Sequence, residues 1–117
     1  MPVYVHFGAG NIGRALAGPI FSRAGYEVVF VDAVPEIVAA LHARKAYRVV
    51  VKDALPPGVP DTFVVTGVDG IAVQDAEAVK NAVARADLIG TAVGAAYLPG
   101  VLAAVATGLP LRAGRPV

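Results

Sequence analysis

Cysteine is absent from the 117-residue sequence, and charged residues are few. Without cysteine the chain cannot form disulfides, Cys-ligated metal sites or thiolate nucleophiles, which is compatible with a reducing cytosol. The formal net charge is only +1, and lysine and arginine do not cluster in any run. The electrostatic pattern of a nucleic-acid binder is therefore missing, and we expect no nucleic-acid partner.

Long apolar runs are also missing. No apolar segment approaches the roughly 18 residues that would suggest a membrane span. The amino terminus has no basic residues ahead of its first apolar stretch, unlike a secretory signal peptide. We therefore expect a cytoplasmic protein with no membrane partner.

Apolar residues, in contrast, are in excess. They make up 56% of the chain and charged residues only 16%, whereas a typical soluble domain is about 25% charged. A domain this small has too much surface for so few charges. We expect self-association through exposed apolar surface, or one face covered by a further part of the protein.

The apolar pattern alternates between the strand and the helix period. Continuous β-rich runs predict buried strands at residues 2–7, 27–31, 70–73 and 87–93. Apolar residues three or four positions apart predict a helix after each strand. The first expected helix contains the apolar residues Ile12, Leu16, Ile20 and Phe21. The second covers residues 35–44, and the fourth covers residues 97–106. The third begins after Asp75, which we expect to be its N-cap. Residues 47–51 and 62–66 flank a Pro- and Gly-dense stretch, which predicts a hairpin-like excursion.

A glycine motif follows the first strand. Residues 8–13, GAGNIG, match G-x-G-x-x-G. In such a loop the first glycine allows a sharp turn, the second brings a pyrophosphate against bare backbone, and the third lets the next helix pack on the strand. The N–H groups at the start of that helix face the phosphates. The strand before and the helix after the motif favour a dinucleotide site over a structural turn.

Asp32 ends the second strand, close to the roughly 20 residues beyond the motif at which a ribose-binding acid is expected. A carboxylate there accepts hydrogen bonds from the adenosine ribose and repels a 2′-phosphate. The following Ala33 and Val34 offer no arginine for such a phosphate. This arrangement favours NAD over NADP.

Together these patterns predict an α/β fold, a Rossmann-like doubly wound and mainly parallel sheet with a β-hairpin-like excursion, truncated after the fourth parallel strand and its helix. Residues 1–108 would form this partial NAD-binding domain, and residues 109–117 an irregular tail. TAVG, residues 91–94, stands at a strand end where ligands of open α/β sheets bind. Both a cofactor contact and a plain strand end fit it.

The stretch HFGAGNIGR, residues 6–14, resembles the amino-terminal motif of the mannitol-1-phosphate 5-dehydrogenases, within the polyol-specific long-chain dehydrogenases. The likeness continues through the Asp32 strand, LHARKAYRVVV, VTGVDGIAV and ADLIGTAVG to about residue 108. It implies hydride transfer between NAD and a sugar-alcohol phosphate, mannitol 1-phosphate or fructose 6-phosphate, with the catalytic lysine in a later domain. No catalytic residue and no metal ligand is expected in this chain. The cofactor contacts that the resemblance implies are Phe7, Gly8, Ala9, Gly10, Asn11, Ile12, Gly13, Arg14, Asp32, Ala92 and Val93.

Another class of protein would fit the same motif. A regulatory module that senses NAD(H) binds the dinucleotide with the same fold and without catalysis.

His6 lies within the first strand, and we expect it to be structural. Arg14 fits either a phosphate contact or a solvated helix position.

Overall fold

Four parallel strands form the centre of the fold. The computed structural model describes residues 2–10, 13–50, 57–58, 62–93 and 96–112. The sheet has the order β5-β2-β1-β6, which confirms the predicted parallel sheet. Its strands are β1 (Val3–Phe7), β2 (Glu27–Asp32), β5 (Val68–Ala72) and β6 (Leu88–Thr91). β5 begins two residues before the predicted strand, and β6 is shorter than predicted at both ends.

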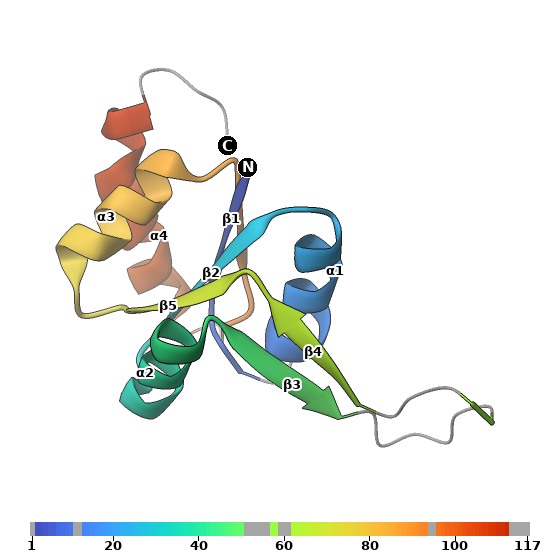
Figure 1. Cartoon of the computed structure of the whole chain (residues 1–117). Helices are drawn as coiled ribbons and strands as arrows, with labels where there is room; N and C mark the ends of the chain where they lie inside the picture. Colours follow the sequence, from blue (N-terminus) through green and yellow to red (C-terminus); the bar gives the residue numbers. More distant parts are fainter. Residues whose placement is uncertain (1, 11–12, 51–56, 59–61, 94–95, 113–117) are drawn as a thin grey trace.

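Helices cover both faces of this sheet, as a doubly wound fold requires (Figure 1). One face carries the π-helical turn η1 (Gly13–Ala17), α1 (Gly18–Arg23) and α2 (Pro35–Arg44), and the other carries α3 (Ala76–Arg85) and α4 (Leu98–Gly108). Side chains of β1 alternate between the two faces. Val5 and Phe7 pack under α3 and α4, whereas Tyr4 packs on the side of α1 and α2. Asp75 caps α3 as predicted, because its carboxylate accepts the N–H of Ala78 at 3.2 Å.

The predicted excursion is an antiparallel hairpin of β3 (Ala46–Val50) and β4 (Thr62–Thr66). It leaves the main sheet and packs over α1 (Figure 1). Lys45 joins α2 to β3 with a φ of 55°, the left-handed conformation that ends many helices. Most of the Pro- and Gly-dense connection lies outside the described residues.

The first helix buries only part of the apolar set that predicted it. Leu16 and Ile20 are 58% and 54% exposed, and the buried residues here are Gly18 and Pro19. The π-helical turn is the cause, because it interrupts the 3.6-residue period on which the predicted apolar face depended. A helix forms where expected, and Phe21 of its predicted apolar residues packs against the core, whereas Leu16 and Ile20 do not.

The predicted irregular tail is partly helical. Residues Leu109–Arg112 form a 3-10 helix, η2, that continues α4. Gly108 allows this continuation to lie against α3, since a Cβ there would come within 2.5 Å of the Val83 Cβ. Residues 113–117 lie outside the described part of the chain. Among the helices of the described residues, none has the length and apolar character needed to cross a bilayer.

Candidate functional site

A cleft of about 570 Å³ opens at the carboxyl ends of β1, β2 and β6. The sheet order places this cleft where the chain reverses direction across the sheet, from β1 toward β2 on one side and β6 on the other. Open α/β sheets bind ligands at such a switch point. Residues from the predicted cofactor set that line it are Phe7, Gly8, Ala9, Gly10, Asp32, Ala92 and Val93.

Gly8 makes the sharp turn out of β1. Its φ is +108°, a conformation that residues with a Cβ rarely adopt. Its N–H donates to the Val31 carbonyl at 2.7 Å, which ties the turn to the end of β2. A Cβ at this position would lie 2.6 Å from the carbonyl oxygen of Ala92, so the ends of β1 and β6 approach each other here because the residue is glycine.

The second and third glycines have different surroundings. A Cβ on Gly10 would meet no atom within 4 Å, so its backbone is bare toward the cleft that it lines. A Cβ on Gly13 would lie 2.5 Å from the carbonyl oxygen of Gly8, so this glycine lets the helix pack against the turn. The turn at Gly8 and the packing at Gly13 agree with the roles that the G-x-G-x-x-G spacing predicts, whereas the pyrophosphate contact of Gly10 stays a prediction.

Asp32 lines the cleft at the end of β2, and Ala92 and Val93 line it after β6, on the opposite side of β1. Its Oδ1 accepts the N–H of Ala33 at 2.7 Å, which fixes the orientation of the carboxylate. Its Oδ2 makes no hydrogen bond within the described residues and can accept one from a ligand. No lysine or arginine is among the described residues that line this cleft, so Asp32 gives it a negative charge.

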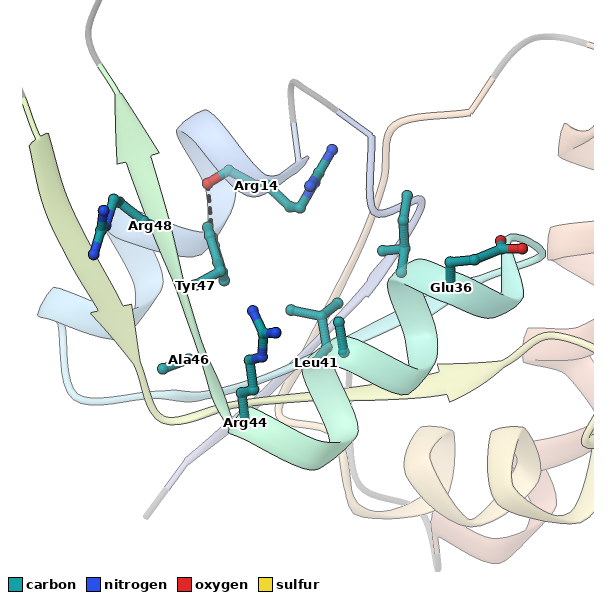
Figure 2. Close-up of a pocket in the computed structure, with 9 residues that line it drawn as sticks. Arg14, Glu36, Leu41, Arg44, Ala46, Tyr47 and Arg48 are labelled. Carbon is teal, nitrogen blue, oxygen red and sulfur yellow. Dashed lines mark hydrogen bonds between the residues drawn. The ribbon is translucent and has the colours of Figure 1, made fainter.

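Arg14 does not line this cleft. It lines a second cavity of about 290 Å³, between η1, α2 and β3, together with Arg44 and Tyr47. Figure 2 shows this cavity and the hydrogen bond between the Tyr47 hydroxyl and the Arg14 carbonyl. The predicted contacts at Asn11 and Ile12 fall outside the described residues.

His6 is buried on the α1 side of β1, away from the cleft. It is 4% exposed, and its Nδ1 lies 2.6 Å from the Tyr4 hydroxyl. Burial lowers the pKa of His6 below its usual value, so the imidazole is neutral near pH 7. Its Nε2 has no hydrogen-bond partner in the described part of the chain. The ring packs beside the backbone of Gly13, which agrees with the structural role expected for it.

The sequence did not single out every residue of the cleft. Val31, Val73, Tyr97, Gly100 and Val101 line it as well, along with Ala33 and Val34. Val73 could have been found from its place directly after a parallel strand, because the carboxyl ends of parallel strands share one edge of the sheet. The start of α4 also lines the cleft, through Tyr97, Gly100 and Val101. No short sequence motif indicates that this helix begins beside the cleft.

A parallel sheet of this order, with a glycine turn and a strand-end acid in one cleft at the switch point, defines a Rossmann-type dinucleotide-binding domain. The family described as the mannitol dehydrogenase Rossmann domain matches residues 2–117, and the chain belongs to this family. A dehydrogenase family with such a domain uses a nicotinamide cofactor.

Curated relatives agree with this family. The chain is 47% identical over 108 residues to the mannitol-1-phosphate 5-dehydrogenase of Brevibacillus brevis, covering 92% of this chain and 27% of that protein. It is 44% identical over 116 residues to the protein of the same name from Shouchella clausii, covering 97% of this chain and 30% of that protein. The chain therefore spans less than a third of the length of these relatives.

Among solved structures, the chain is similar to one assigned as a 2-dehydropantoate 2-reductase from Enterococcus faecalis. The TM-score is 0.61, with 18% sequence identity, over 92% of this chain and 30% of that one. At this identity the similarity concerns the fold alone.

Proposed function

We propose that the chain binds NAD(H) in the cleft between Asp32 and Ala92. In this proposal it is the cofactor domain of a cytoplasmic oxidoreductase that transfers hydride between NAD and a sugar-alcohol phosphate, of the mannitol 1-phosphate and fructose 6-phosphate type. One observation carries the proposal: a single cleft joins the strand-end acid, the bare glycine backbone and the end of β6.

The residues present suit a dinucleotide. The cleft volume of about 570 Å³ falls in the range of roughly 300–1,000 Å³ usual for ligand sites. The open space at Gly10 suits a pyrophosphate, which needs close approach to backbone N–H groups. Asp32 on one side and Ala92 and Val93 on the other suit the two ends of an extended dinucleotide.

Each part of the cleft has a separate task in this proposal. Asp32 accepts hydrogen bonds from the ribose hydroxyls, with its orientation held by the Ala33 N–H. Gly8 and Gly10 keep side chains away from the phosphates. When bound, NAD supplies the hydride acceptor, and the protein contributes orientation. The groups that bind the polyol phosphate and move its proton would belong to the part of the relatives that this chain does not span, so we expect no turnover by the chain alone.

The test is a titration of the chain with NADH, followed by fluorescence, for wild type and Asp32→Ala. Hydrogen bonds to a charged group contribute about 1.5–3 kcal/mol. We therefore expect the Kd for NADH to rise roughly 10- to 150-fold. Preference for NADH over NADPH should fall as well, since the carboxylate no longer repels a 2′-phosphate. Glu77→Gln on α3 is the control, because it removes an exposed acid that lies outside the cleft.

The outcomes separate the hypotheses. An unchanged Kd in Asp32→Ala would mean that the ribose does not bind at this acid. NADH binding by a full-length protein that oxidises no polyol phosphate would favour the NAD(H)-sensing module over the dehydrogenase. Oxidation of mannitol 1-phosphate by the 117-residue chain alone would contradict the assignment of catalysis to another domain.

A further inference from the structure

In the π-helical register of the first turn after the glycine motif, the residue that would donate to one of the carbonyls is a proline. Residues Gly13–Ala17 are π-helical, and in this register a carbonyl accepts from the N–H five residues later. For the carbonyl of Arg14 that residue is Pro19, which has no N–H. Buried carbonyls that lose their helical donor take another donor or lose stability.

Tyr47 supplies the missing donor from a distant part of the sequence. Its hydroxyl donates to the Arg14 carbonyl at 2.7 Å, across 33 positions in the sequence (Figure 2). The hydroxyl reaches this carbonyl because residue 18 is glycine. A Cβ on Gly18 would overlap the Tyr47 hydroxyl oxygen. Burial raises the pKa of Tyr47 to about 12, although the positive charge of Arg14 acts to lower it, so the hydroxyl keeps its proton and remains a donor.

Arg14 connects this hydrogen bond to the cleft. Its own N–H donates to the carbonyl of Gly10 at 3.0 Å. Gly10 is the bare-backbone glycine that lines the cleft. The chain of contacts therefore runs from the Tyr47 hydroxyl to the Arg14 carbonyl, and from the Arg14 N–H to the glycine loop.

We infer that Tyr47 is a positioning residue for the cofactor site, because its hydroxyl replaces the hydrogen bond that Pro19 cannot make and thereby holds the glycine loop in the form that takes the dinucleotide. The role in cofactor binding rests on the proposed function, whereas the replaced hydrogen bond rests only on the contacts described above. The β3–β4 hairpin is then part of the binding machinery, although its Tyr47 lies outside the cleft.

The decisive experiment compares Tyr47→Phe, Pro19→Ala and the double variant. Tyr47→Phe removes only the hydroxyl, and the NADH Kd should rise about 3- to 10-fold, the effect of one neutral hydrogen bond. The rise stays moderate because water can enter from the 290 Å³ cavity that Tyr47 lines. In the double variant residue 19 regains an N–H for the Arg14 carbonyl, so the Kd should return to within about twofold of that of Pro19→Ala alone.

A matched control is available in Tyr26→Phe. Tyr26 is also half-buried against α1, and its hydroxyl makes no hydrogen bond among the residues that the structure describes. Its loss should leave the NADH Kd unchanged. All titrations are run well below the unfolding temperature of the least stable variant, so that a change in Kd does not reflect unfolded protein.

Amide hydrogen exchange of residues 13–18 gives a second readout that does not need the cofactor. Exchange should be faster in Tyr47→Phe and slower again in the double variant. Unchanged exchange, or failure of Pro19→Ala to restore it, would overturn the replaced hydrogen bond. Altered exchange with an unaltered Kd would overturn the positioning role. If wild type does not bind NADH, the proposed function fails together with the role in cofactor binding, and the exchange series alone decides whether Tyr47 replaces the lost donor.

Discussion

Replacing Gly8 by alanine is the sharpest test of how the cleft is built, because two separate effects act at this residue. The φ of +108° must be kept by a residue with a Cβ, which costs about 1–2 kcal/mol. In addition, the new Cβ would stand 2.6 Å from the Ala92 carbonyl oxygen. That oxygen belongs to backbone and cannot swing aside as a side chain would.

The second effect disturbs the pairing of β1 with β6. The N–H of Ala92 donates to the Phe7 carbonyl at 2.9 Å, so moving the Ala92 peptide strains this bond. A weakened hydrogen bond and imperfect packing add about 1–2 kcal/mol. We therefore expect Gly8→Ala to lower the free energy of unfolding by roughly 2–4 kcal/mol, a large part of the stability of a small domain.

Gly25→Ala is the matched control. Gly25 also has a positive φ, +90°, but a Cβ there would meet no atom within 4 Å. Its loss of stability should therefore be the backbone effect alone, about 1–2 kcal/mol. Urea unfolding followed by circular dichroism measures both variants. Equal losses for Gly8→Ala and Gly25→Ala would refute the close approach of β1 and β6, and with it the shape given to the cleft.

The remaining predictions concern the loop, pH and assembly. Gly10→Ala should weaken NADH binding at least tenfold while changing the unfolding midpoint little, since its added Cβ points into open space. A loss of NADH affinity that comes with a comparable loss of stability would contradict a binding role for the Gly10 backbone. Burial alone would raise the pKa of Asp69, but hydrogen bonds from Lys45, His42 and a backbone N–H outweigh it and lower the pKa below its usual value. The folded state is therefore stabilised by this carboxylate at pH values above the usual pKa of an aspartate and loses the contribution as pH falls, so the stability gap between wild type and Asp69→Asn in urea should shrink in acid. Sedimentation at rising concentration should reveal self-association through the exposed apolar residues of α4, and a monomer at every concentration would argue against it.

The parallel sheet and its cleft could be predicted because the patterns that indicate them lie within short stretches of the sequence. The glycine spacing after β1 predicted a sharp turn at Gly8 and close packing at Gly13, and both are present. Asp32 could be predicted as part of the cleft since the carboxyl ends of parallel strands meet at one edge. Short-range pattern and spacing suffice for such features.

What the sequence could not give depends on contacts between distant residues. The π-helical turn at Gly13–Ala17 precedes a proline in α1 and accepts a hydrogen bond from a tyrosine of the hairpin, so the helical period alone could not show that Leu16 and Ile20 are exposed. Similarly, Gly108 lies close to α3 directly before η2, and no local pattern indicates this approach. Whether Arg14 contacts a phosphate stays a prediction. The residue lines the second cavity and not the cleft to which the other predicted cofactor contacts belong.

The alternation of β1 between two cores limits how this protein can change during evolution. Val5 and Phe7 belong to the core under α3 and α4, while Tyr4 and His6 occupy the opposite side. Inserting or deleting one residue in β1 would exchange these sets, moving the imidazole into a purely aliphatic and aromatic environment and the large apolar groups out of theirs. The strand should thus accept substitutions of similar volume but no change in length, so variation in length among family members is expected to be confined to the connections and absent from β1.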